Sequence, residues 1–336
     1  MPTRTGRKGA FRYRTARGHV IRDEAALARI EALAIPPAWK GVWISPRAGT
    51  KLQATGYDAA GRKQYLYHPA FRAAQEQEKY DSLILFGERL PALRSAMAEH
   101  LDRDELDRDR VAAVALRLIA LGWFRVGSER YARDGTYGVT TLLRRHVRVR
   151  GSRVQLAFRA KAGVQVRTEL VDAELAAAIR GLLTVRPGAR VFKYRWEGDL
   201  YNLTSPRLND YVKVYLGEEF SAKDFRTWGG TLLAATHFAE RAARTGVPET
   251  AAAQKREVAA VMRLVAQKLG NTPAVCRASY VAPAVVEQYL DGRTIEDFRP
   301  RHLRVVKARD LELSPEEAAV LSLLRSWRIR QARKAA

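Results

Sequence analysis

The sequence has very little cysteine: Cys276 is the single one among 336 residues. One cysteine cannot form an intramolecular disulfide, and it cannot supply the ligands of a cysteine-based zinc site. The sequence also has no run of about 18 apolar residues, the length that a membrane-spanning helix requires. Its first residues, MPTRTGRKGAFRYR, lack the apolar segment of a secretory signal. These absences predict a soluble, cytoplasmic protein.

Acidic residues are scarce relative to basic ones, with 36 Asp and Glu against 59 Lys and Arg and a formal net charge of +23. Such an excess repels itself in the folded state unless a polyanion binds, and nucleic acid is the usual polyanion. An anionic membrane is the alternative, but the sequence contains no basic amphipathic helix and no lipidation signal. We therefore expect nucleic acid as the partner and no membrane association.

The basic excess is densest at the N-terminus, where residues 1–75 contain fourteen Lys and Arg but only four Asp and Glu. A helix start at Asp23-Glu24 predicts a helix over 25–33. Alternating patterns then predict strands at 42–45, 51–55 and 63–68. This part of the chain is expected to form a small antiparallel β-sheet domain.

A polar, charged stretch at 69–80 has only a weak hydrophobic pattern, and we place a domain junction in it or just after it. The length of the chain also suits two domains rather than one core. The prediction is an N-terminal, nucleic-acid-binding sheet domain at 1–84 and a second domain at 85–336.

Helical patterns dominate after residue 84, where apolar residues recur about every 3.6 positions. The expected helices cover 90–101, 109–121, 172–183, 206–216, 224–243, 250–270, 282–290 and 315–334. Three alternating segments interrupt them at 146–150, 154–158 and 164–170, joined by turns. The second domain is therefore predicted to be mainly α-helical with one small β-hairpin sheet, which makes the chain an α+β protein.

The strand KQYLYH places Tyr65 and Tyr67 two residues apart and so on one face of the sheet. Two interpretations remain open. The tyrosines form part of a small sheet core, or they belong to a basic, aromatic face that lies on a DNA groove with Gln53, Lys63 and Gln64 beside them.

Two cations occupy positions that favour binding an anion. Arg125 follows the apolar segment VAAVALRLIALGWF, and an arginine at such a helix end must pair with a carboxylate or with a bound anion. Lys161 lies in the turn AKAG at a hairpin tip. It is either a solvated loop lysine or a flexible cation that reaches into a groove and transfers a proton.

Two further cations lie in FSAKDFRTWGGT, where Ser221 and Asp224 form a capping pattern that predicts a helix start. Lys223 and Arg226 are three residues apart and therefore lie on one side of the first helical turn. A helix start with two cations is an anion site, or else an ordinary basic surface.

The segment LGNTPAVCRASY predicts a helix end at Gly270, a restart at Thr272-Pro273 and a short helix that leads to Tyr280. Asn271 fits a plain helix cap. Taken alone, a tyrosine there is most simply a half-buried side chain with a satisfied hydroxyl.

Taken together and in order, these segments resemble the type IB DNA topoisomerases, specifically the compact poxvirus-type enzymes and their bacterial relatives. The matching segments are RVGSERY at 125–131, FRAK at 158–161, AKDFRTWG at 222–229, LGNTPAVCRASY at 269–280 and LQATGYDAAGRKQYLYH at 52–68. The resemblance covers nearly the whole chain.

The resemblance implies a monomer that closes as a two-lobed, C-shaped clamp around double-stranded DNA, in the cytoplasm and associated with the nucleoid. It implies the catalytic fold shared with tyrosine recombinases, and relaxation of supercoils through a 3′-phosphotyrosyl intermediate without ATP or a divalent metal. By motif, Tyr280 matches the nucleophile, Arg125 and Arg226 match the phosphate-binding arginines, and Lys161 matches the general acid.

The same motifs assign Lys223 as a supporting cation beside the general acid and Tyr131 as a DNA contact. Asn271 departs from the family, which commonly has histidine there. Asparagine donates or accepts a hydrogen bond without titrating, so we expect a neutral hydrogen bond to a phosphate oxygen at this place.

The sequence leaves two alternative functions to consider. Tyrosine site-specific recombinases share the Arg-Lys-Arg-Tyr set, but they usually have His-x-x-Arg where this chain has Lys223 and Arg226, and their N-terminal domain is typically helical. A non-catalytic DNA-clamping protein would explain the charge alone, but it would not need the four residues Arg125, Lys161, Arg226 and Tyr280.

Overall fold

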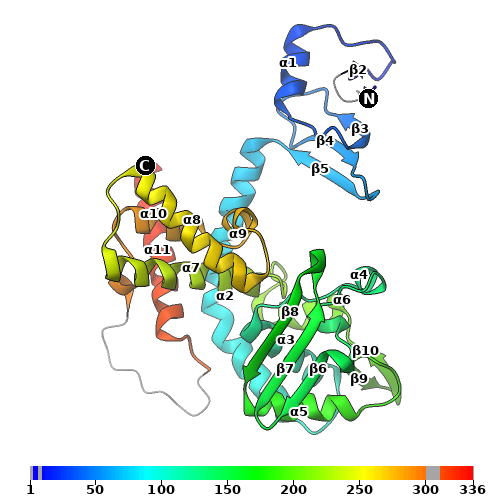
Figure 1. Ribbon diagram of the computed structural model, residues 1–336, viewed down its shortest axis with the longest axis vertical. Helices are drawn as coiled ribbons and strands as arrows, with labels where there is room; N and C mark the ends of the chain where they lie inside the picture. Colours follow the sequence, from blue (N-terminus) through cyan, green and yellow to red (C-terminus); the bar gives the residue numbers. More distant parts are fainter. Residues whose placement is uncertain (1–2, 7–9, 300–310, 336) are drawn as a thin grey trace. The chain divides into compact units, whose positions relative to one another are not determined.

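A computed structural model describes residues 3–6, 10–299 and 311–335, and the chain divides into two compact units, Met1–Lys79 and Tyr80–Ala336 (Figure 1). The boundary predicted at residue 84 lies within helix α2, Pro69–Leu101, which runs through the junction. The polar stretch 69–80 is thus helical rather than an irregular linker. Its Ala, Gln, Glu and Lys residues are strong helix formers, so this stretch continues α2 although it has no apolar stripe.

The first unit is built on an antiparallel sheet with the strand order β2-β1-β3-β4-β5. Its elements are β1 Thr3–Thr5, β2 Arg12–Arg14, α1 Glu24–Ala32, β3 Lys40–Ile44, β4 Leu52–Tyr57 and β5 Lys63–Tyr67. The Asp23 carboxylate caps α1 by accepting from the Ala26 amide at 3.2 Å. A small core of Ile30, Val42, Ile44 and Ala54 holds the helix to the sheet.

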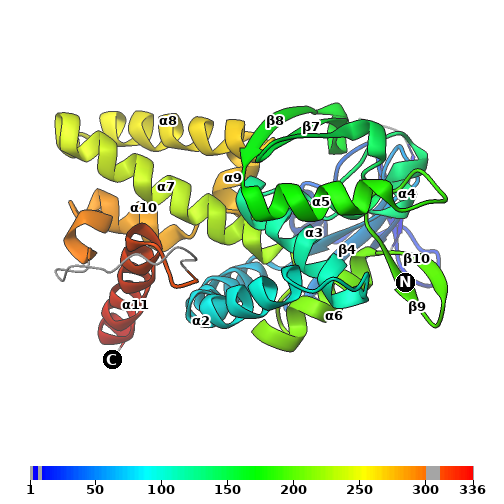
Figure 2. The same cartoon turned by 90° about the horizontal axis from the view of Figure 1, so that it is seen from below.

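The second unit is mainly helical, as predicted. After α2 its helices are α3 Arg108–Gly122, α4 Glu129–Arg133, α5 Ala173–Thr184, α6 Ser205–Leu216, α7 Asp224–Thr245, α8 Ala251–Leu269, α9 Pro273–Ser279, α10 Pro283–Leu290 and α11 Pro315–Ala335. Helices α7 and α8 lie side by side, and α9 follows at the end of α8 (Figure 2).

Helix α3 is the centre of this unit. Eight of its residues between Val111 and Ile119 are buried, and it contacts α5, α6, α7 and the strand β9, Lys193–Trp196. Alanines at 112, 113 and 115 let neighbouring helices approach closely, while the leucines and isoleucine supply apolar area worth about 1.5–3 kcal/mol each when fully buried. The helix ends at Gly122, just before Arg125.

The small sheet predicted in this unit is present as an antiparallel β6-β7-β8 sheet, with β6 Val147–Arg150, β7 Arg153–Arg159 and β8 Gln165–Val171. A second hairpin, β9 Lys193–Trp196 and β10 Asp199–Asn202, was not expected from the sequence. Its signal is the Glu197-Gly198 turn between two alternating tetrapeptides.

An ion pair between the half-buried Arg94 and the buried Glu317, joined by Trp228, links α2, α7 and α11. The Arg94 guanidinium donates to both Glu317 carboxylate oxygens, at 3.0 and 2.7 Å, and the Trp228 indole N–H donates to the same carboxylate at 3.1 Å. Burial opposes ionisation, but Arg94 holds the pKa of Glu317 below its usual value. Because both charges are paired and hydrogen-bonded, the contact fixes how the three helices pack.

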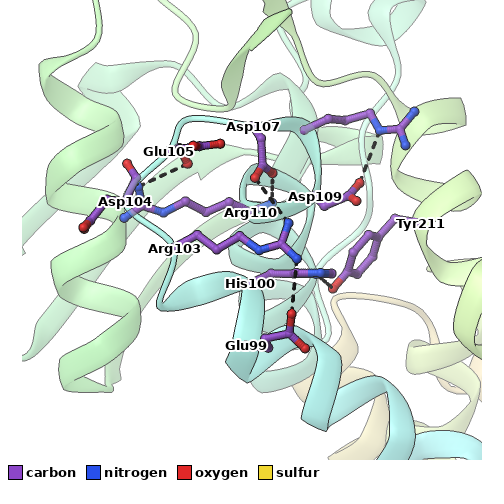
Figure 3. A network of polar contacts seen from close by, with 10 residues as sticks. Glu99, His100, Arg103, Asp104, Glu105, Asp107, Asp109, Arg110 and Tyr211 are labelled. Carbon is purple, nitrogen blue, oxygen red and sulfur yellow. Dashed lines mark hydrogen bonds and ion pairs between the residues drawn. The ribbon is translucent and has the colours of Figure 1, made fainter.

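A polar network links the end of α2 to the start of α3 (Figure 3). Arg103 bridges Glu99 and Asp107, each at 3.3 Å. Beside it, the His100 Nδ1 atom lies 2.8 Å from the Tyr211 hydroxyl of α6, in a buried hydrogen bond. Burial lowers the pKa of His100 and raises that of Tyr211, so both groups are neutral in the folded protein.

The burial of His100 in this network predicts that the folded protein loses stability in acid. Because the folded-state pKa of His100 lies below its ordinary value of 6.5, the unfolded chain binds the proton more readily, and stability falls as pH drops below 6.5. In urea unfolding across that range, His100→Gln is expected to remove a slope of up to about 1.4 kcal/mol per pH unit. His19→Gln, at an exposed position, is the control and should leave the slope unchanged. An unchanged slope in His100→Gln would contradict the assignment.

Candidate active site

The segment after α8 stops and restarts the helix as the sequence predicted. Gly270 adopts a left-handed conformation, with φ of 60°, and ends α8. The Thr272 hydroxyl then caps α9 by accepting from the Val275 amide at 3.3 Å, and Pro273 occupies the first turn. Tyr280 follows at the C-terminal end of α9, where its amide donates to the Cys276 carbonyl at 2.9 Å.

Helix α7 fixes the backbone of Tyr280. A Cβ atom on Gly230 would lie 2.5 Å from the Tyr280 carbonyl oxygen, so only glycine permits this approach. The Thr231 hydroxyl donates to the same carbonyl at 3.4 Å and accepts from the Ala282 amide at 3.1 Å. The main chain around Tyr280 is therefore held from one side while its side chain is only half-buried.

Arg226 lies in the first turn of α7 and is 4% exposed. Its guanidinium donates to the Trp123 carbonyl and, at 2.8 Å, to the Leu269 carbonyl. The guanidinium carbon also lies 5.0 Å from the centre of the Tyr280 ring, which is within cation–π range. Arg226 thus connects the end of α3, the end of α8 and the tyrosine.

Arg125 approaches the same place from the end of α3. Its guanidinium donates to the Gly270 carbonyl at 3.0 Å and to the Asn271 side-chain oxygen. Since arginine has only donors, the atom of Asn271 that faces it must be the oxygen, which leaves the amide nitrogen on the other side. Burial, and then the nearby charge of Arg226, lower the pKa of Arg125.

The two guanidinium groups have no carboxylate partner among the residues that the structure describes, and neutral carbonyl and amide oxygens hold them instead. Two buried donors also remain without a partner there: the Nε of Arg226 and the Nδ2 of Asn271. Burying two neighbouring positive charges without a counter-ion is costly. The arrangement is therefore a site for an anion beside Tyr280.

Cys276 does not compete with Tyr280 as a nucleophile. It is fully buried in α9, and burial raises the pKa of its thiol although Arg226 and Arg125 act in the opposite direction.

Lys161 lies at a hairpin tip, as predicted, in the turn Lys161–Gly163 between β7 and β8. It is exposed and its ammonium group lies 5.4 Å from the centre of the Tyr131 ring. Lys161, Tyr131 and Arg125 line one cavity of about 200 Å³. A second cavity of about 540 Å³ is lined by Arg125, Arg226 and residues of β8, so Arg125 borders both.

Lys223 is the residue that precedes α7, and its side chain is exposed. It is adjacent to the cluster in sequence but makes none of the contacts that join Arg125, Arg226, Asn271 and Tyr280. The Asp224 carboxylate accepts from the Ser221 amide and hydroxyl at 2.9 and 3.0 Å, which closes the turn before α7. The predicted cap itself is not formed, because Lys223 occupies the N-cap position and no side chain caps the helix.

The predicted aromatic face is present in the first unit. Lys63, Tyr65 and Tyr67 are exposed on one face of β5, and the two tyrosine rings stack with centres 6.3 Å apart. Gln64 points away from this face and donates to Asp58 at 2.9 Å. The interpretation of the tyrosines as a sheet core does not hold, because they are 51% and 38% exposed.

Gln53 was expected beside this face, and the structure corrects that placement. Its side chain is 2% exposed and donates to the Ala48 and Thr50 carbonyls at 2.7 and 2.6 Å, while it accepts from Arg29 at 3.1 Å. With every polar atom satisfied internally, Gln53 stabilises the loop between β3 and β4. Tyr57, at 44% exposure, is an aromatic surface residue of the same sheet that the sequence did not single out.

Sequence reasoning also missed the residues that hold the cluster together. Trp123 adopts a left-handed conformation, with φ of 48°, and so turns its carbonyl toward Arg226. A Cβ atom on Gly229 would overlap the Trp123 indole. The consecutive glycines after Trp228 were a visible signal of close packing, whereas the left-handed tryptophan had none.

Among the described residues, no group of three or more His, Cys, Asp or Glu side chains is arranged to hold a metal ion. Each helix of the described part of the chain is too short or too polar to span a lipid bilayer.

Comparison with known proteins gives two family matches. Residues 68–300 match the model described as eukaryotic DNA topoisomerase I, catalytic core, and residues 10–58 match bacterial DNA topoisomerase IB, N-terminal domain.

Individual relatives agree with these matches. DNA topoisomerase 1B of Acanthamoeba polyphaga mimivirus is 32% identical over 268 residues, covering 78% of this chain and 79% of the relative. DNA topoisomerase I of Monkeypox virus and DNA topoisomerase 1B of Vaccinia virus (strain Copenhagen) are each 21% identical over 251 residues, covering 74% of this chain and 75% of the relative.

The contact between Gly230 and Tyr280 predicts that Gly230→Ala destabilises the fold. The added methyl group must displace the Tyr280 backbone, which costs about 1–3 kcal/mol for an overpacked interior. Gly181→Ala is the matched control, because a Cβ atom on this exposed glycine of α5 meets nothing within 4 Å. That change should instead raise the free energy of unfolding by about 0.5–1 kcal/mol. Equal effects of both changes in denaturant unfolding would refute the close approach.

Proposed function

The chain belongs to the type IB DNA topoisomerases, and from this membership we propose how its site acts on DNA. The enzyme is a DNA topoisomerase, an isomerase that relaxes supercoiled DNA by transient cleavage and rejoining of one strand. The observation that carries the proposal is the pair of guanidinium groups of Arg125 and Arg226, held by neutral oxygens beside Tyr280 and without a carboxylate partner in the described part of the chain.

In the forward step, the Tyr280 hydroxyl oxygen attacks a backbone phosphorus and loses its proton to solvent. A bond forms between tyrosine and phosphorus, and the bond to the 5′ oxygen breaks. The product is a 3′-phosphotyrosyl link and a free 5′-hydroxyl. Rejoining is the reverse, in which the 5′-hydroxyl attacks phosphorus and the phenolate leaves. A phenolate leaves more easily than an alkoxide, so rejoining stays accessible.

Arg125 and Arg226 bind the two non-bridging oxygens, because forked donors match a phosphate and are already in place before the reaction. The unpartnered Nδ2 of Asn271 and Nε of Arg226 are the donors that a phosphate would satisfy. Preorganised donors of this kind are each worth about 3–4 kcal/mol in the transition state.

The leaving 5′ oxygen needs a proton, and Lys161 is our candidate for the general acid. This role is supported by the position of Lys161 on the hairpin tip, where it lines a cavity that Arg125 also borders. The tip also approaches the end of α8, since a Cβ atom on Gly270 would lie 3.4 Å from Val164. Lys223 supports the phosphate from the start of α7 as an additional exposed cation.

The energy of the broken bond is conserved in the tyrosine–phosphate link, so the reaction needs no ATP. We propose that the guanidinium groups meet the developing charge, so that no divalent metal is required. Rotation of the free DNA end then releases supercoils. We propose that the protein acts as a monomer that clamps double-stranded DNA, with Tyr131, Lys63, Tyr65 and Tyr67 contacting it. Its location is the cytoplasm, on the nucleoid.

The first test is relaxation of negatively supercoiled plasmid in EDTA and without ATP. We expect complete relaxation at moderate salt, since fixed cations rather than a metal meet the developing charge. No relaxation at any salt concentration would contradict the proposal. A site-specific recombinase, by contrast, would require two partner sites on the DNA.

Replacing Tyr280 with phenylalanine removes the nucleophile and leaves the arginine cluster intact. Tyr280→Phe should abolish relaxation and the covalent protein–DNA adduct seen on denaturing gels, while plasmid binding stays within about twofold. Tyr215→Phe, on α6, is a control that should retain the adduct. An adduct in Tyr280→Phe would mean that another residue is the nucleophile.

Asn271 is predicted to act as a neutral donor. Asn271→Ala should slow single-turnover cleavage by about 100-fold, the lower range for loss of one preorganised donor. Asn271→His should restore much of the rate but add a pH dependence near 6.5, the ordinary histidine pKa, which the asparagine enzyme lacks. A pH profile that is the same for both chains would argue against contact between this side chain and the phosphate.

A further inference from the structure

The β9–β10 hairpin carries aromatic side chains that the active site does not use. In its register Tyr194 lies opposite Tyr201, and Trp196 lies opposite Asp199. Because side chains alternate along a strand, Tyr194, Trp196 and Tyr201 share one face. Trp196 is 58% exposed and Tyr201 is 45% exposed. Large aromatic groups gathered on a surface mark a binding site more often than isolated ones do.

These rings border a cavity of about 280 Å³. Its lining is Arg108, Tyr194, Trp196, Glu197, Tyr201 and Arg207. The rings of Tyr194 and Tyr201 stack with centres 5.9 Å apart and planes 27° from parallel. The lining of this small cavity therefore combines three aromatic side chains with two arginines and one glutamate.

The hairpin is held rigidly, so the site is preformed. The Arg195 amide donates to the Leu106 carbonyl at 2.7 Å. Lys193 is buried and its ammonium group donates to the Val185 and Pro187 carbonyls at 2.9 and 2.5 Å. The Arg195 amide lies at the free edge of β9, and the Lys193 side chain lies on the face opposite Tyr194, so neither occupies the aromatic face.

The charges at the cavity favour one phosphate. Arg207, on the first turn of α6, is exposed and has no hydrogen bond or ion pair to any residue that the structure describes. Arg108 pairs with Asp109 at 3.3 Å, which partly neutralises it. Glu197 lies in the hairpin turn and repels additional phosphates. A duplex presents phosphates along two strands, whereas a single nucleotide presents one.

We propose that this cavity binds one unpaired nucleotide of single-stranded DNA, separately from the duplex at Tyr280. The base stacks on Trp196 and Tyr201, as bases stack on aromatic side chains in single-strand-binding proteins. Its phosphate binds Arg207. Stacking does not distinguish the four bases strongly, so the site is expected to tolerate any sequence.

The direct test is photocrosslinking of the full chain with a single-stranded hexanucleotide that contains 5-iodouracil, followed by peptide mapping. Adducts on Trp196 or Tyr201 are expected. If 5-iodo-dUMP crosslinks as efficiently as the hexanucleotide, the ligand is a free nucleotide, and if it does not, the ligand is a strand. No adduct within 194–201, or equal competition by a blunt duplex, would overturn the proposal.

Variants provide the second measurement, since the net charge of the protein alone attracts single strands. Trp196→Ala should weaken hexanucleotide binding about tenfold, as expected for one base stack, while Trp196→Phe retains most of it. Arg207→Ala should weaken it more than Arg256→Ala, a change of the same charge at an exposed position of α8. Plasmid relaxation should be unchanged in all four, so a failure of this site is distinguishable from a failure of the catalytic proposal. Equal binding by Trp196→Ala and the wild type would contradict the inference.

Discussion

Two neighbouring guanidinium groups, of the half-buried Arg125 and the buried Arg226, have no carboxylate partner within the described residues, and the catalytic unit depends on this feature. Arg125 and Arg226 reach one point from the ends of different helices, and main-chain carbonyls of Trp123, Leu269 and Gly270 orient them. A carboxylate at that point would neutralise them and occupy the place of a phosphate. The fold instead leaves an electrostatic cost in the free protein that an anion relieves, which is how a preorganised site gains affinity for developing negative charge.

The surrounding structure serves to keep that arrangement in place. Helix α3 is buried almost all round, so its end is fixed where Arg125 follows. Gly230 lets α7 touch the backbone of Tyr280, and the Arg94–Glu317 pair anchors Trp228 two residues beyond Arg226. Lys161, in contrast, lies exposed on a hairpin tip. A rigid set of charges beside the exposed lysine that we propose as the proton donor suits an enzyme whose donor meets its substrate only when DNA is bound.

Local signals in the sequence predicted the helix ends and turns that carry the candidate site residues. The segment leading to Tyr280 contains a glycine stop and a Thr-Pro restart, and helix caps depend on such nearby residues. Two features that come from tertiary packing were not predictable: the left-handed Trp123 and the internal hydrogen bonds that bury Gln53. The helix through 69–80 was missed for a different reason, because its residues favour a helix but form no apolar stripe. The hairpin at 193–202 was overlooked although its turn and alternation are visible in the sequence.

The central claim is that one tyrosine carries the DNA, and peptide mapping of the trapped covalent complex tests it most directly. A nicked duplex that loses its short leaving strand after cleavage traps the intermediate, and proteolysis with mass spectrometry then locates the nucleotide. A single adduct on Tyr280, linked through a 3′ phosphate, is expected. An adduct on another residue, or a link through a 5′ phosphate, would contradict it.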